Sequence, residues 1–103
     1  MKDLIETIVQ HKSMFVCKQT GDELLLIPLK DNVADFNQYL VLNQLGAYIW
    51  EALNSSITID LLQEKILTEF EVTQEQLYAD LEQFIPELHR FTCPKWVQLV
   101  ASA

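Results

Sequence analysis

The chain has 103 residues, of which half are apolar and about a fifth are charged, a composition typical of one globular domain and not of a disordered or fibrous protein. Fifteen acidic residues stand against seven lysines and arginines, so the formal net charge of −8 repels nucleic acids and favours cationic partners. The two glycines, Gly21 and Gly46, are too few for a glycine-rich phosphate-binding loop.

The sequence shows no targeting signal and no cysteine motif that would indicate a redox or metal site. The first residues include Asp3 and Glu6 and lack an apolar run of signal-peptide length, and no segment is long enough to cross a membrane, so we predict a cytoplasmic protein without membrane contact. Cys17 and Cys93 show no Cys-x-x-Cys or Cys-His spacing, which predicts reduced structural thiols. A redox or metal pair would require that the fold bring the two thiols together.

The first half of the chain has the pattern of a sheet. Residues 14–19 and 23–29 are rich in strand-forming residues and flank Thr20-Gly21-Asp22, which predicts a hairpin. Pro28 cannot donate a ladder hydrogen bond, so we expect it at a strand end or on an edge, with the second strand ending near Leu29. After a polar loop over residues 30–35, residues 36–42 alternate in polarity and predict a third, half-buried strand.

The second half has the pattern of three helices. Asn43, Thr58 and Thr73 have side chains that can cap helix N-termini, and each precedes apolar residues at helical spacing. Pro86 should kink or end the third helix near Ile85, and residues 92–94 form a second stop. The predicted fold class is therefore α+β and winged helix-turn-helix-like, with a three-stranded antiparallel sheet followed by three helices.

The sequence offers little for catalysis or DNA binding. His11 and His89 have no neighbours that would make them bases or ligands, so we assign no catalytic residue, no metal site and no cofactor. A hairpin with three helices is also the architecture of a winged-helix DNA-binding regulator. However, the region from Ile66 to Leu88 has six acidic residues and no lysine or arginine, which opposes contact with phosphates.

The third predicted strand has an edge that the sequence leaves unprotected. Residues 36–42 contain no lysine and no proline, the residues that commonly block an edge strand. Such an edge can accept a peptide as an additional strand, a function that requires no catalytic residue. The alternative is that the edge is paired inside the fold or in a structural homodimer, and the pattern alone leaves both open.

Four segments carry a resemblance to a known family. They are LNQLGAYIWEAL (42–53), TIDLL (58–62), EFEV (69–72) and LYADLEQF (77–84), and in this order they resemble the PqqD family of recognition elements for ribosomally made, post-translationally modified peptides. The likeness covers residues 14–91, which leaves residues 1–13 as an N-terminal extension and residues 92–103 as a C-terminal tail. We expect Trp96 in that tail to fold back on the core, with an exposed partner anchor as the alternative.

The resemblance implies a function and a site. A precursor's leader peptide would dock as a further strand against the third strand, between that strand and the third helix, and would be delivered to a tailoring enzyme such as a radical S-adenosylmethionine protein. Both a quinone-cofactor pathway and another peptide product stay open. Carried onto this chain, the peptide-contacting residues are Phe36, Asn37, Gln38, Tyr39, Leu40, Val41, Gln76, Leu77, Asp80, Leu81 and Phe84.

Two groups within this set have different expected roles. Leu77, Leu81 and Phe84 should divide their surface between the core and the cleft. Asp80, with a weaker contribution from Gln76, could pair with a basic or hydrogen-bonding leader residue, although a solvated helix face explains these two residues equally well.

Overall fold

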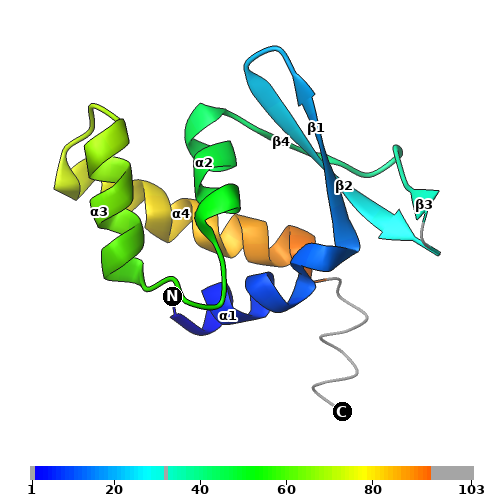
Figure 1. The fold of residues 1–103 in the computed structure, drawn as a ribbon, viewed down its shortest axis with the longest axis horizontal. Coiled ribbons are helices and arrows are strands. Elements are labelled where there is room, and N and C mark those ends of the chain that lie inside the picture. The colour runs from blue at the N-terminus through cyan, green and yellow to red at the C-terminus, as the bar shows by residue number, and fades with distance from the viewer. Residues whose placement is uncertain (1, 32, 94–103) are drawn as a thin grey trace.

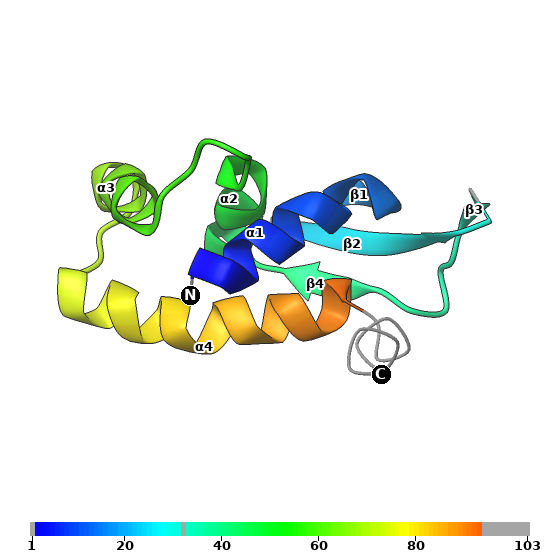
Figure 2. The same ribbon diagram turned by 90° about the horizontal axis from the view of Figure 1, so that it is seen from below.

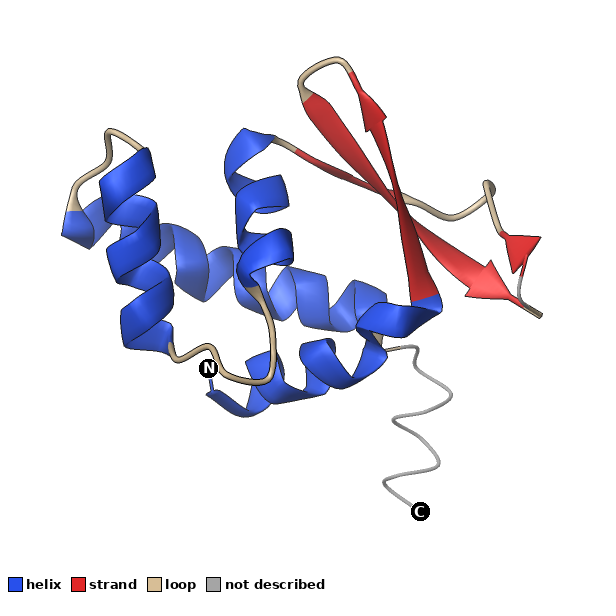
Figure 3. Cartoon of the chain, viewed as in Figure 1, coloured by secondary structure: helices blue, strands red, loops and turns tan. Residues whose placement is uncertain are grey.

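The structure is a computed structural model that describes residues 2–31 and 33–93. The described residues form a helical half and a sheet half (Figures 1 and 3). In chain order the elements are α1 (Lys2–His11), the 3-10 turn η1 (Lys12–Met14), β1 (Phe15–Thr20), β2 (Glu23–Lys30), β3 (Val33–Ala34), β4 (Leu40–Leu42), α2 (Gln44–Ala52), α3 (Ile59–Glu69) and α4 (Gln74–Thr92).

The sheet is antiparallel and is organised around β2. On one side β2 pairs with β1, from Phe15 opposite Pro28 to Thr20 opposite Glu23. On its other side β2 pairs with β4 at one end and with the short β3 at the other end. The α+β class and the antiparallel sheet are confirmed, and the described residues add α1, η1 and β3 to the predicted elements.

The predicted third strand is wrong over more than half its length. Of residues 36–42, the structure has only Leu40–Leu42 as a strand, and residues 36–38 are turn and bend. The reason is competition for the same partner, because β3 pairs with Leu29 and Lys30 of β2, where a longer β4 would have paired. The backbone N–H of Asn37 donates to Oδ1 of Asp35 at 3.0 Å, which stabilises the turn that follows β3.

Pro28 lies inside the central strand, which corrects the expectation that it would occupy a strand end or an edge. Its carbonyl accepts a hydrogen bond from the N–H of Asp35 at 2.8 Å, so the backbone groups of Pro28 face the side of β3 and β4. On that side β4 pairs with residues 24–26 and β3 pairs with residues 29 and 30. In the register of β3 the N–H that proline lacks would point at the carbonyl of Asp35, and this carbonyl instead accepts from the N–H of Gln38 at 3.3 Å.

The predicted hairpin is confirmed. β1 and β2 are joined by Gly21 and Asp22, and Gly21 has a φ angle of +60°. A positive φ at the first of two loop residues, followed by a negative φ at the second, matches a type II′ turn, in which glycine is favoured at this position. The second strand ends at Lys30, one residue beyond the predicted end.

All three predicted helix caps are confirmed. The side chain of Asn43 accepts from the N–H of Gly46 at 2.8 Å, and Thr58 and Thr73 accept from the third residue of their own helices at 3.1 Å each. Each cap satisfies one of the backbone donors that the first turn of a helix leaves without a partner. These short-range bonds fix where α2, α3 and α4 begin.

The third predicted helix does not end at Pro86. Helix α4 runs from Gln74 to Thr92 with Pro86 inside it, and Figure 2 shows it as one continuous helix. An interior proline costs about 3 kcal/mol in an isolated helix. Here Ile85 and Leu88, on either side of Pro86, are fully buried in the core, and this packing holds both halves of α4 in place. The second predicted stop is confirmed, because α4 ends at Thr92.

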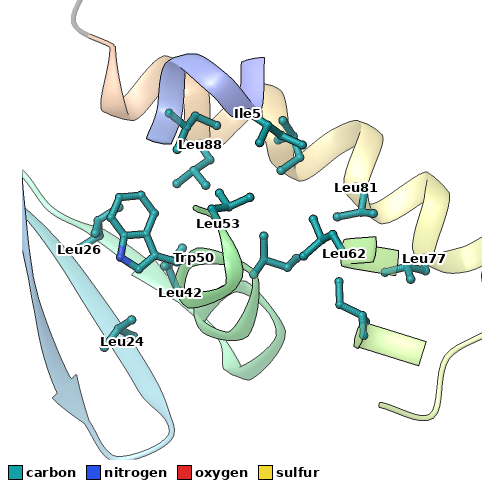
Figure 4. Close-up of a cluster of buried hydrophobic side chains, with 14 residues drawn as sticks. Ile5, Leu24, Leu26, Leu42, Trp50, Leu53, Leu62, Leu77, Leu81 and Leu88 are labelled. Carbon is teal, nitrogen blue, oxygen red and sulfur yellow. The ribbon is translucent and has the colours of Figure 1, made fainter. Parts of the chain in front are cut away.

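One hydrophobic core joins both halves of the protein (Figure 4). It combines Leu24, Leu26 and Leu42 from the sheet with residues of all four helices, and Ile5 and Ile8 of α1 belong to it. Residues 1–13 were predicted as an extension without a placed role, yet α1 supplies two buried side chains. The signal was present in the sequence, because Leu4, Ile5 and Ile8 have the spacing of one helix face.

The two cysteines occupy different environments. Cys93 is buried at the end of α4, and burial raises the pKa of its thiol, whereas Cys17 is exposed on β1. A structural packing role therefore fits Cys93 and does not fit Cys17. Among the described residues there is no cluster of three or more His, Cys, Asp or Glu side chains that could hold a metal ion. Trp96 and residues 97–103 lie outside the described residues.

Helix geometry also bears on the membrane prediction. Within the described ranges, no helix combines the length and the apolar character needed to span a bilayer.

Lys12 ties the N-terminal region to the end of α2. Its ammonium group donates to the carbonyl oxygens of Trp50 and Leu53 at 2.7 and 2.8 Å and lies 4.9 Å from the centre of the Trp50 ring. Carbonyls at a helix C-terminus lack partners in the helix and carry partial negative charge, so a lysine there stabilises the helix end. Partial burial is the main influence on Lys12 and lowers its pKa.

Replacing Lys12 with methionine should therefore destabilise the protein. Methionine keeps the apolar stem and removes both hydrogen bonds, and we expect the free energy of unfolding to fall by about 1–2 kcal/mol. Urea denaturation followed by circular dichroism measures the change. Lys18→Met, which alters an exposed lysine on β1, is the matched control and should change the stability by less than about 0.5 kcal/mol. Equal effects of the two substitutions would contradict the capping role.

Candidate functional site

The backbone orientation of β4 follows from the register of the sheet. In a strand the N–H and C=O of one residue point to the same side, and this side alternates from residue to residue. Because the carbonyl of Pro28 faces β3 and β4, the backbone groups of Leu24 and Leu26 face β4 as well. These two residues lie opposite Leu42 and Leu40, so the backbone groups of Leu40 and Leu42 face β2.

Val41 is therefore the residue of β4 whose backbone faces outward. All three residues of β4 are described, and within this strand Val41 alone presents its N–H and C=O on the side away from β2. Its side chain is 44% exposed, whereas Leu40 is half-buried and Leu42 is buried in the core. The sheet therefore offers an edge at β4 that has the polar groups required for strand addition.

The junction between β4 and α2 fixes the position of this edge. Leu42 is buried, Asn43 caps α2, and Gly46 lies against both residues. A Cβ atom at Gly46 would lie 3.3 Å from Oδ1 of Asn43 and 3.4 Å from Cβ of Leu42, closer than most real Cβ contacts. Glycine thus lets α2 start directly beside the end of β4. Sequence reasoning assigned Gly46 no role, although its place three residues after a cap pointed to this close approach.

Residues 36–39 continue from the edge of β4 as an exposed segment. Phe36 is 61% exposed and Tyr39 is 52% exposed, although aromatic side chains of this size are mostly buried in folded proteins. Asn37 and Gln38 are exposed as well. All four residues were predicted as peptide-contacting, and the structure leaves their side chains accessible to a partner.

The predicted contacts from α4 are divided between the core and the surface. Leu77 and Leu81 are fully buried among core side chains, so the expectation that they would share their surface with a cleft is wrong in this structure. Their spacing of four places them on the inner stripe of α4, directed at the core. Phe84 is half-buried and packs against the same core, to which Leu40 and Leu42 of β4 also contribute. The core therefore connects α4 to β4.

The polar residues of α4 lie on its accessible side. The side-chain amide of Gln76 donates to Oδ1 of Asp80 at 2.9 Å, which pairs the two predicted polar contacts with each other. Tyr78, two residues from both of them and therefore on a different side of the helix, is exposed, and a hydrogen bond with Glu82 raises the pKa of its hydroxyl. Asp80, which is half-buried, is therefore the acidic group on the side of α4 that carries the two predicted polar contacts.

A strand-binding edge needs no concave pocket, and the cavities described by the structure lie elsewhere. An open cavity of about 430 Å³ lies between α1 and the connection from α2 to α3. Its lining includes Ile5, Val9, Ile57 and Ile59 and none of the predicted peptide-contacting residues.

Comparison with known proteins gives two findings. The family model described as coenzyme PQQ synthesis protein D (PqqD) matches residues 12–90. A solved structure described as TbiB1 in complex with the TbiA(beta) leader peptide superposes with a TM-score of 0.57 at 24% sequence identity and covers 73% of this chain and 81% of that one. This likeness shows the fold. No curated protein matches the chain.

Proposed function

This chain belongs to the PqqD family, and on that premise we propose that it is a non-catalytic peptide chaperone. It captures the leader of a ribosomally made precursor peptide by strand addition and presents the precursor to a modifying enzyme. The observation that carries the proposal is the outward-facing backbone of Val41 on β4. The leader peptide bound to TbiB1, a protein of similar fold, supports the same assignment.

The proposed site combines the β4 edge with the accessible side of α4. The leader strand pairs with β4 and lies toward α4, with Phe36 and Tyr39 as apolar contacts and Asp80 and Gln76 as polar ones. Main-chain hydrogen bonds supply affinity, and the side chains that flank the strand supply specificity. The net charge of −8 favours a cationic leader and accelerates its encounter with the protein.

The proposed partners follow from this mode of binding. A chaperone of this kind works with a tailoring enzyme, for which a radical S-adenosylmethionine protein is the leading candidate, and it needs no metal or cofactor of its own. The precursor belongs either to a quinone-cofactor pathway or to another peptide natural product. The chain acts in either setting through the same edge.

A fluorescence anisotropy titration tests the proposal. The probe is a labelled synthetic peptide with the leader sequence of the short open reading frame nearest the gene for this protein, and a scrambled peptide is the control. We expect saturable binding with a Kd in the micromolar range or tighter, weakened by added salt because opposite charges are screened. Absence of binding at hundreds of micromolar folded protein would contradict the chaperone function.

A further inference from the structure

The edge that the structure presents is short for strand addition. β4 spans Leu40–Leu42, and within these described residues Val41 supplies the outward N–H and C=O. A peptide strand that pairs only here would form two main-chain hydrogen bonds. Strand addition takes its affinity from a row of such bonds, so a longer edge is required for binding of useful strength.

The registers of β3 and β4 on β2 do not match. If the pairing of β4 with β2 continued along the chain, Tyr39 would lie opposite Ile27 and Asn37 opposite Leu29. In the structure Ala34 lies opposite Leu29, three residues earlier in the sequence. The two registers thus differ by three residues, and the turn between β3 and β4 contains these three residues in addition to those that one continuous strand would need. The chain can therefore pair with the far end of β2 in either of two registers.

We propose that the peptide-binding form of this protein uses the second register. In this form residues 36–42 make one continuous strand that pairs with β2, and the pairing of β3 with β2 is lost. The backbone groups of Asn37, Tyr39 and Val41 then form the edge on which the peptide docks. This inference rests on the proposed function and extends it, because it assigns the backbone groups that pair with the leader. In this form the outward N–H and C=O groups increase from one residue to three.

Two features of β3 favour its release, against the hydrogen bonds that Asp35 makes with Pro28 and Asn37 in the present register. β3 has two residues, and the side chain of Val33 is 68% exposed. Asp31, just before β3, has a φ angle of +54°, a conformation that is unfavourable for residues other than glycine and is better tolerated by aspartate than by most others. The shifted register opens this turn and releases Asp31 from it.

The shifted register also improves the placement of the exposed aromatic residues. The alternation of residues 36–42 puts Phe36 on the same face as Leu40 and Leu42, which is the face toward the helices. Tyr39 would lie beside Val41 on the opposite face, across from Ile27. Burying part of Phe36, now 61% exposed, favours this form.

Pro28 explains why the shifted register is not the resting form. The shift places Gln38 opposite Pro28 at a position where paired residues exchange hydrogen bonds, and proline has no N–H to donate. In the present register Asp35 lies opposite Pro28 and donates its N–H to the Pro28 carbonyl, while the carbonyl of Asp35 accepts from the N–H of Gln38 in place of the missing proline donor. The docked peptide strand compensates for this loss through the new outward bonds.

Two engineered disulfides that share one cysteine test the proposal. Leu29→Cys with Ala34→Cys locks the present register, and Leu29→Cys with Asn37→Cys locks the shifted one. Leu29 is at a position whose backbone groups face β1, so both pairs are of the closely spaced kind that a disulfide can bridge. Both variants carry Cys17→Ser, because Cys17 is exposed. Cys93 is retained, since burial raises the pKa of its thiol and suppresses the thiolate.

The readout is the anisotropy titration with the labelled leader peptide, before and after reduction of each disulfide. We expect the lock on the present register to weaken binding at least about tenfold and the lock on the shifted register to match or exceed the reduced protein. We also expect the peptide to accelerate formation of the disulfide between positions 29 and 37.

The outcomes separate the two proposals. If wild-type protein binds the peptide and both locked forms bind it equally, the register shift is wrong while the chaperone function stands. The same conclusion follows if the disulfide between positions 29 and 37 never forms with peptide present. If wild-type protein does not bind the peptide, the chaperone function fails, and the register shift fails with it.

Discussion

Replacing Trp50 with alanine should lower the free energy of unfolding by about 3–5 kcal/mol, the range expected when a large aromatic side chain is removed from a core. Trp50 is 4% exposed, and its ring meets that of Phe15 edge to face with 6.1 Å between the ring centres. The ammonium group of Lys12 lies over the same ring. The substitution therefore leaves a cavity where α2, β1 and the N-terminal region meet.

The matched control for Trp50 is Tyr48→Ala on the same helix. Tyr48 is half-buried and makes an edge-to-face contact with Phe70 at 5.3 Å, so its loss should cost about 1–2 kcal/mol. Urea denaturation followed by circular dichroism measures both variants, because this signal does not depend on Trp50. An equal loss of stability in the two variants would refute the assignment of Trp50 as the central contact of this junction.

The stability of this junction matters for the proposed function because β4 is fixed by its pairing with β2 and by its side chains in the core, and not by a partner on its outer edge. Leu42 and Trp50 anchor the strand and the helix in one core, and Gly46 allows the two elements to meet closely. A strand that accepts a peptide must keep its outer edge open while its inner edge and one face are fixed. The segment from Leu42 to Trp50 fixes the inner edge and one face of β4 through its buried side chains and through the helix cap at Asn43.

Local signals in the sequence predicted most of the fold. Asn43, Thr58 and Thr73 marked three helix starts, and the hydrogen bonds that make them caps span three residues each. Gly21 marked the hairpin turn for the same reason, since the conformation of a turn depends on the residues within it. Caps and turns can be predicted from sequence because the residues that form their hydrogen bonds lie within a few positions of one another in the chain.

The features that sequence reasoning missed depend on contacts between distant segments. The alternation of residues 36–42 indicated a strand, but β3 occupies the part of β2 that this strand would need. Pro86 indicated a kink or an end of the helix near Ile85, but α4 continues to Thr92 because Ile85 and Leu88 are buried in the core. In both cases a tertiary contact outweighs a correct local preference.

The same limit applies to the candidate site. The stripe of Leu77 and Leu81 at helical spacing showed that one side of α4 is buried, but it could not show that the whole surface of both side chains is used by the core. The position of the docking edge could be predicted from the sequence, because Val41 belongs to the strand pattern that lacks lysine and proline. Which residues of that strand face outward depends on the register with β2, and no local pattern determines that register.

Replacing Val41 with proline should weaken binding of the leader peptide about tenfold or more, which corresponds to about 1.4 kcal/mol. Proline removes the outward N–H of β4 and places a ring where the peptide backbone would approach. The ladder with β2 is preserved, because Leu40 and Leu42 supply the backbone groups that face β2. We therefore expect the free energy of unfolding to stay within about 1 kcal/mol of wild type.

The control for Val41→Pro is the same change on the opposite edge of the sheet. Val16 lies opposite Ile27, whose backbone groups face β1, so those of the next residue, Cys17, point away from β2. Cys17→Pro thus removes an outward N–H from an exposed edge strand without touching β4, and it should leave peptide binding unchanged. If both prolines weakened binding equally, the effect would come from the sheet as a whole. Weakening by Val41→Pro alone would assign the peptide to β4, and this result does not depend on which register residues 36–39 adopt, since Val41 faces outward in both.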